Sequence, residues 1–185
     1  MIIFGTISSS YAQRGSYESI ASFTATQNTT TISFTSIPAT YKHLEVRYVA
    51  RRTGGAGSFS DLALRMNSVS SNSYDYQYIY AENGGTPSHY GQFGVDRLTA
   101  GMVTAPSSPA NYFAAGYTII PEYASTNREK TIQFFCGQQT QTSDKNATYL
   151  GVSNYRSTSA VNRLDFYTGG DFIAGTTFSL YGIKA

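Results

Sequence analysis

The sequence predicts an all-β protein that folds as an antiparallel two-sheet sandwich, jelly-roll-like in its topology. Eight or so segments rich in Tyr, Phe, Ile, Val and Thr alternate apolar with polar residues, at the period of two that half-buried strands show. Clusters of Gly, Pro, Asn, Asp and Ser separate these segments. No segment shows sustained helical periodicity. An immunoglobulin-like sandwich is the alternative, but the chain has no Trp and a single Cys.

Residues 30–51 contain the clearest pair of strands. Alternation places Ile32 and Phe34 on one face of the first strand, and Pro38 lies where the chain must turn. In the second strand Leu44, Val46, Tyr48 and Ala50 are expected to face inward, and His43, Glu45, Arg47, Val49 and Arg51 outward. This inward row is the best-supported part of the predicted core.

The remaining segments suggest one domain. Further strands are expected at residues 17–26, 61–67, 74–80, 111–120, 129–139, 146–156, 161–168 and 176–184. Residues 82–111 are rich in Gly and Pro, and they predict long loops around one short strand near 93–99. A chain of 185 residues is long enough for a single core without a metal or disulfide. We therefore expect an N-terminal arm, residues 1–15, followed by a single β-sandwich domain, residues 16–185.

The arm begins with three large apolar residues, Ile2, Ile3 and Phe4, and continues through a polar, Ser-rich stem. Apolar side chains on such a stem must be buried somewhere. They predict either a first edge strand that docks on its own sheet or an arm that clamps a neighbouring subunit. Ile2, Ile3 and Phe4 are therefore candidate contact residues.

The segment YDYQYIY places Tyr74, Tyr76, Tyr78 and Tyr80 on one face of an extended strand. Tyrosine combines a large contact area with a hydroxyl and little side-chain entropy, so such rows occur at interfaces and on surfaces that stack sugars. Three interpretations remain open: a row that packs over the edge of the core with hydroxyls reaching water, a protein interface, and a carbohydrate-stacking surface. These four residues are the second group of candidate contacts.

Composition argues against several function classes. The chain has 13 Lys and Arg against 11 Asp and Glu, scattered without a basic stripe, so a nucleic-acid partner is not expected. No apolar run could cross a bilayer, and the N-terminus lacks the features of a signal peptide. Cys136 alternates with apolar residues and is expected to be buried and unpaired. No cofactor or metal motif is present. The sequence has two histidines, His43 and His89, but no serine lies in the nucleophile-elbow pattern G-x-S-x-G. We expect no enzymatic activity and no cofactor.

Three stretches resemble a group of small virion structural proteins of tailed bacteriophages. They are YESIA at residues 17–21, SFTSIP at 33–38 running into TYKHLEVR at 40–47, and FSLYGIK at 178–184. The resemblance spans most of the chain from residue 17 onward. Members are β-rich proteins associated with capsid decoration or with tail and fibre parts.

The resemblance implies a capsid decoration, or cement, protein made in the host cytoplasm and located on the capsid exterior. Its implied partners are further copies of itself, as a homotrimer, and the major capsid protein. The alternative is a tail-fibre or receptor-binding tip that recognises host-surface carbohydrate and uses Tyr74, Tyr76 and Tyr78 to stack sugar rings. Neither nucleic acid nor a membrane is an expected partner.

Overall fold

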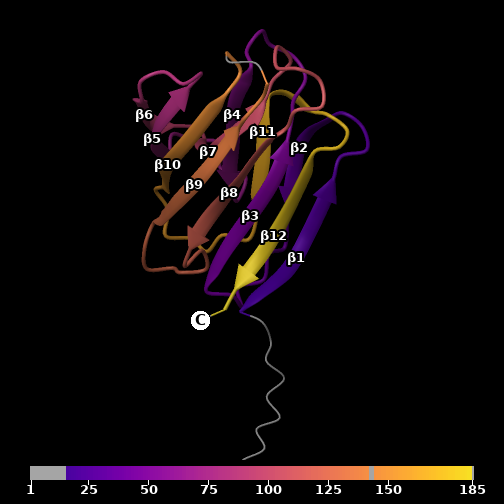
Figure 1. The fold of residues 1–185 in the computed structure, drawn as a ribbon. Coiled ribbons are helices and arrows are strands. Elements are labelled where there is room, and N and C mark those ends of the chain that lie inside the picture. Colours follow the sequence, from indigo (N-terminus) through magenta and orange to yellow (C-terminus); the bar gives the residue numbers. More distant parts are fainter. Residues whose placement is uncertain (1–15, 142–143, 185) are drawn as a thin grey trace, which may run out of the picture.

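The computed structural model describes residues 16–141 and 144–184, which form a β-sandwich of two antiparallel sheets. The prediction of an all-β, two-sheet fold is confirmed (Figure 1). The strands are β1 (Tyr17–Thr24), β2 (Thr29–Phe34), β3 (His43–Ala50), β4 (Phe59–Met66), β5 (Tyr74–Glu82), β6 (Ser88–Val95), β7 (Leu98–Thr104), β8 (Ala114–Pro121), β9 (Lys130–Gln138), β10 (Ala147–Tyr155), β11 (Leu164–Phe172) and β12 (Thr177–Ile183).

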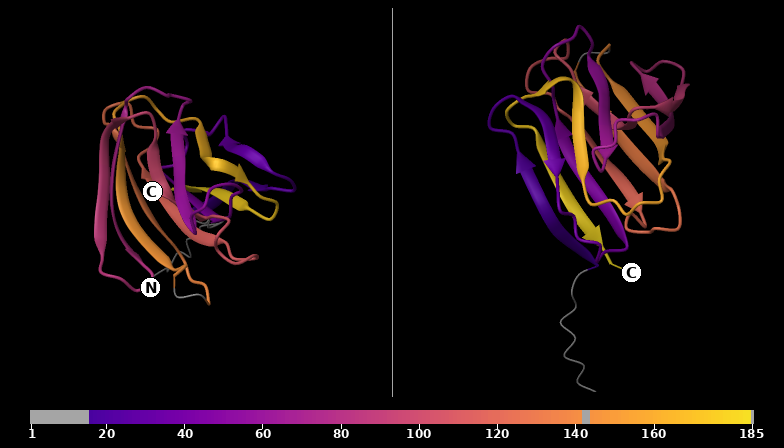
Figure 2. Two further views of the ribbon diagram at one scale, coloured as in Figure 1. Left: turned by 90° about the horizontal axis from the view of Figure 1, so that it is seen from above. Right: turned by 180° about the vertical axis from the view of Figure 1, so that it is seen from behind.

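The two sheets differ in size. The larger sheet has eight strands in the order β1-β12-β3-β8-β9-β10-β5-β6, and the smaller has four in the order β2-β11-β4-β7. Seen from above and from behind, the smaller sheet lies against one face of the larger one (Figure 2). The larger sheet therefore has an outer face that the smaller sheet does not cover.

The core fills the space between the sheets, and the predicted inward row contributes to it. Ile32, Phe34, Leu44, Val46 and Tyr48 are all buried. They pack with aromatic side chains of the C-terminal strands; the Tyr48 ring, for example, stacks on Phe178 at 5.4 Å between centroids. Alternation identified these core positions correctly because both strands are half-buried.

The prediction of long loops around one short strand was wrong for residues 82–111. Two strands, β6 and β7, lie within this range. All seven residues of β7 are buried, so its sequence LTAGMVT shows no polar alternation. The Gly residues that suggested loops have local roles instead: Gly101 has a φ of 138° and lies close to the Tyr48 hydroxyl.

Two of the five residues expected to face outward from β3 and its end are buried. Glu45 is held by hydrogen bonds from Tyr17 and Arg47. Arg51 lies just past the end of β3, and its guanidinium donates to the carbonyl oxygens of Ser108, Pro109 and Tyr112 at 2.9–3.0 Å. Alternation fails there because the loop after β7 wraps around Arg51.

Residues 1–15, including Ile2, Ile3 and Phe4, lie outside the described part of the chain, so the contact role of the arm stays a prediction. Residues 16–141 and 144–184 contain no helix with the length and apolar character needed to cross a bilayer.

Candidate functional site

A row of exposed apolar side chains crosses the outer face of the larger sheet. Antiparallel pairing places Ile79 of β5 opposite Leu150 of β10, Leu150 opposite Phe135 of β9, and Phe135 opposite Tyr117 of β8. Ile79 and Leu150 are 54% and 52% exposed, and the rings of Phe135 and Tyr117 pack in a tilted arrangement at 6.1 Å between centroids. We call these four residues the outer row. It is one continuous line because cross-strand partners in a sheet share a face.

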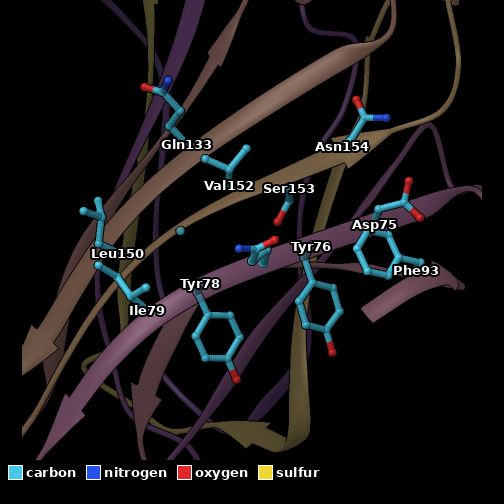
Figure 3. A pocket seen from close by; sticks show the side chains of 12 residues that line it. Asp75, Tyr76, Tyr78, Ile79, Phe93, Gln133, Leu150, Val152, Ser153 and Asn154 are labelled. Atoms are coloured by element: carbon cyan, nitrogen blue, oxygen red, sulfur yellow. The ribbon is translucent and has the colours of Figure 1, made fainter. Parts of the chain in front are cut away.

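A shallow trough lies beside the outer row at the β5 and β10 end. It has a volume of about 700 Å³ and is lined by Ile79, Leu150, Val152 and Phe93 together with polar side chains such as Gln133 (Figure 3). Phe93, from β6, is 78% exposed. An aromatic side chain left in water next to an apolar row is a feature of surfaces that bind a partner.

The strands that carry this face present almost no charge on it. The outward positions of β5, β8, β9 and β10 are Asp75, Gln77, Ile79, Ala81, Ala115, Tyr117, Ile119, Thr131, Gln133, Phe135, Gly137, Thr148, Leu150, Val152 and Asn154. Asp75 is the one residue among them that carries a charge at neutral pH, and it forms an ion pair with Arg156 at 3.4 Å. A partner that covers the outer row therefore has few charges to desolvate.

The sequence carried a signal for the outer row that alternation alone did not use. In β9, Phe134 and Phe135 are adjacent, so they must face opposite sides of the sheet. In β10, Tyr149 faces the core, whereas Leu150 and Val152 face the opposite side of the sheet. Apolar residues on both faces of two neighbouring strands indicate a sheet that is covered on one side and presents apolar surface on the other.

The predicted tyrosine row faces the inside of the sandwich. Tyr74, Tyr76 and Tyr78 are buried, and Tyr80 is half-buried. Their rings pack on one another and on Tyr149: Tyr78 stacks on Tyr149 at 5.2 Å and on Tyr76 at 6.2 Å. The sticks of Tyr76 and Tyr78 extend to the opposite side of β5 from Gln133 and Val152 (Figure 3). The contact role of the row stays a prediction, but its first three members offer a partner little ring surface.

A polar hollow opens on this inner face, near the β5–β6 edge. Its volume is about 410 Å³, and we call it the tyrosine hollow; its lining consists of Asp61, Tyr76, Tyr78, Tyr80, Glu82, Tyr90, Gln92, Arg97 and Tyr149. Hydrogen bonds connect part of the lining. The Tyr76 hydroxyl donates to Gln92 at 2.9 Å, Gln92 donates to the Tyr90 hydroxyl at 2.7 Å, and the Tyr149 hydroxyl donates to Glu82 at 2.7 Å.

The hollow also perturbs its ionisable groups. Burial is the largest cause that raises the pKa values of Tyr78 and Tyr149 above the ordinary range. The Asp61 side chain is exposed within the hollow but surrounded by protein from both sheets, and this loss of bulk water raises its pKa, opposed by the positive charge of Arg97. At neutral pH the tyrosines are therefore neutral hydroxyls.

The groups considered for catalysis or metal binding do not form a site in the described residues. His43 accepts a hydrogen bond from the backbone nitrogen of Glu122 at 3.1 Å, and His89 is exposed on β6. Cys136 is buried, as predicted, and burial raises its pKa to about 11, so its thiol is protonated at neutral pH. In the range that the structure describes, no group of three or more His, Cys, Asp or Glu could hold a metal ion.

Comparison with known proteins adds little to this geometry. No family model matches the sequence, and no curated protein matches it. Among solved structures, the chain is similar to the carbohydrate recognition domain of Emp47p, with a TM-score of 0.23 and 8% identity over 91% of this chain and 88% of that chain. A similarity at this level supports no inference about function, so the surfaces themselves carry the argument.

Proposed function

We propose that the chain is a phage capsid decoration protein that binds the outer shell through the outer row and stabilises it by protein–protein contacts. The observation that carries the proposal is the uncharged line of Ile79, Leu150, Phe135 and Tyr117 on the outer face of the larger sheet. The sequence resemblance to virion structural proteins supplies the context. The proposal assigns the protein no catalytic activity.

The outer face suits a large, preformed partner surface. Strands β9 and β10 are hydrogen-bonded on both sides, so they cannot accept an additional strand from a partner. A contact there must be made by side chains that pack on a rigid sheet. A specific interface of this kind buries about 800 Å² on each partner. A small molecule or a short peptide is too small to cover that area.

Many copies of the protein, each bound by a weak interface, then act together. If each protein contacts the shell and its own neighbours, later contacts form at a high effective concentration, so avidity exceeds the affinity of one interface. In this proposal the arm, with Ile2, Ile3 and Phe4, joins neighbouring copies as a homotrimer. The outer row remains available for the major capsid protein.

The location of the protein in the particle tests the proposal. DNA-free heads should be purified and the copy number of this chain compared with that of the shell subunit by quantitative mass spectrometry. A ratio near one for one supports decoration. A handful of copies confined to the tail contradicts it.

Deletion of residues 2–10 separates decoration from the alternative, a receptor-binding tip. A decoration protein that depends on its arm should no longer be recruited to heads after the deletion. A tip should tolerate the deletion and should bind host cells when purified. Normal recruitment of the deleted protein to heads would remove the arm from the mechanism and leave the outer row as the contact.

A further inference from the structure

The larger sheet extends past the smaller one at its β5–β6 edge. Strand β7 is the edge of the smaller sheet, and it packs mainly against β8, β9 and β10. From behind, the strands at this edge continue beyond the smaller sheet (Figure 2). The inner face of β5 and β6 therefore forms the floor of the tyrosine hollow and is open to solvent.

Polar side chains replace the aliphatic core at this overhang. Under the smaller sheet the inward positions are residues such as Val46, Ile132 and Phe134, whereas in the hollow they are tyrosines, Gln92 and Glu82. Stacking covers most of the ring faces of Tyr76, Tyr78 and Tyr149. The lining consequently offers hydroxyl, amide and carboxylate groups to the space between the strands.

Of the two carboxylates in the hollow, Asp61 is the one that lacks a protein partner. No described residue donates a hydrogen bond to its carboxylate or forms an ion pair with it, although Arg97 lies near enough to influence it. Glu82 in contrast accepts from Tyr149. The Asp61 carboxylate is exposed to the hollow and has no protein donor, so it is free to accept hydrogen bonds from a ligand there.

The lining discriminates among ligand classes. Two carboxylates against one arginine disfavour a phosphate or another anion. The described residues hold no cluster of metal ligands, and the hydroxyl-rich walls disfavour a purely apolar molecule. A ligand with many hydroxyls satisfies both the carboxylate acceptors and the amide and guanidinium donors. Tyr90, 43% exposed at the rim, can pack its ring against a C–H face.

We propose that the tyrosine hollow is a binding site for a saccharide. Asp61 and Glu82 accept hydrogen bonds from sugar hydroxyls, Gln92 and Arg97 donate to ring or hydroxyl oxygens, and Tyr90 stacks on the sugar. The volume of about 410 Å³ lies within the range of about 300–1,000 Å³ that small-molecule sites occupy. This site lies on the opposite face of the larger sheet from the outer row, so it does not depend on shell binding.

The site differs from a surface formed by stacking on the tyrosine row. Tyr74 and Tyr76 cannot place a free ring face against a sugar because their rings are buried. Recognition instead uses the edges and hydroxyls of Tyr76, Tyr78 and Tyr149, with a single exposed ring at the rim. Such a site favours a sugar inserted edge-on between the two sheets.

A direct binding experiment tests the site. The full chain should be applied to an array of immobilised neutral and acidic oligosaccharides, and each positive glycan should then be titrated as a free sugar by isothermal calorimetry. Asp61→Asn and Tyr90→Ala should each weaken binding by about tenfold or more, because each removes a direct contact to the ligand. Asp144→Asn and Tyr117→Ala are matched controls, since both side chains are exposed away from the hollow.

Three outcomes would overturn the proposal: no glycan bound on the array, binding that both hollow variants leave unchanged, and binding lost equally in Tyr117→Ala. Spermidine titrated into the same protein checks the competing class. Binding of the polyamine in place of sugars, lost in Asp61→Asn, would also overturn it. Shell recruitment of Tyr90→Ala should stay normal, so failure here and failure of the decoration proposal can be told apart.

Discussion

Tyr78 and Ile79 are consecutive in β5 and face opposite sides of the larger sheet. Tyr78 is 8% exposed and its ring stacks on Tyr149, whereas Ile79 is 54% exposed and lies opposite Leu150 in the outer row. Strand β5 thus contributes its even-numbered residues to the tyrosine hollow and the odd-numbered Ile79 to the proposed shell contact. Substitutions at adjacent positions can therefore test the two surfaces separately.

Leu150→Asp should disrupt shell binding with little effect on folding. The carboxylate lies in the middle of the outer row, where a partner would have to desolvate it, and we expect the affinity for heads to fall by about thirtyfold or more. The free energy of unfolding should change by less than about 0.5 kcal/mol because the site is exposed in the free protein. Co-sedimentation with purified heads and denaturant unfolding measure the two effects.

Thr131→Asp is the matched control for that experiment. Thr131 is exposed on the same face, in β9, but lies outside the outer row. Its variant should bind heads like the parent protein. Equal loss of binding in both variants would indicate a general charge effect and would contradict a contact through the outer row.

The protein should lose stability at alkaline pH. Burial raises the pKa of Tyr74 to about 12 and raises those of Tyr78 and Tyr149 further. These folded-state pKa values exceed the unfolded value of about 10. The stability that the neutral hydroxyls contribute is therefore complete below pH 10 and is lost as the pH rises through the folded-state values. Each such tyrosine should lower the unfolding free energy by about 1.4 kcal/mol per pH unit in that range.

Thermal unfolding between pH 8 and 11.5, with tyrosinate absorbance recorded in parallel, measures this dependence. Burial lowers the pKa of Lys130 and gives an opposite slope as its ammonium loses a proton, but one lysine cannot balance three tyrosines. Tyr74→Phe should flatten the alkaline decline. Stability that stays constant up to pH 11.5 would contradict the burial of these hydroxyls.

Gly151→Ala should destabilise the sandwich. Gly151 faces the core from β10, and a methyl group there would lie 2.6 Å from the Cβ of Tyr78 and overlap the ring of Phe134. Overpacking of this kind costs about 1–3 kcal/mol, which chemical denaturation can measure. Thr148→Ala, at an exposed position of the same strand, should have little effect.

A second substitution checks the cause. Phe134→Leu removes part of the ring that the new methyl group meets, so the double variant should be less destabilised than the sum of the two single variants. Additive effects would mean that Gly151 is required for backbone reasons and not for space beneath the ring.

Arg51→Met should loosen the loop between β7 and β8. The variant leaves the carbonyl oxygens of Ser108, Pro109 and Tyr112 without their donor, and we expect the unfolding free energy to fall by about 3 kcal/mol. Hydrogen exchange of residues 105–112 should accelerate. Arg128→Met is the control, because the Arg128 side chain is 68% exposed and lies outside this loop. Unchanged exchange in the Arg51 variant would show that other contacts hold the loop.

Local pattern predicted much of this fold, and the failures have specific causes. Where a strand is half-buried, as in β2 and β3, alternation identified its core face correctly. It missed β7 because a strand that is buried along its whole length has no polar side to alternate with. It placed Arg51 outward because no local signal reveals that a distant loop will wrap around that guanidinium.

The sequence by itself determined the all-β class, the positions of most strands and the burial of Cys136, because these depend on residue types at a period of two. Tertiary structure decided the rest. The outer row exists because the pairing order brings Ile79, Leu150, Phe135 and Tyr117 into line, and the tyrosine hollow exists because eight strands extend past four. Pairing order and sheet size arise from contacts distant in sequence, so alternation within one strand carries no information about them.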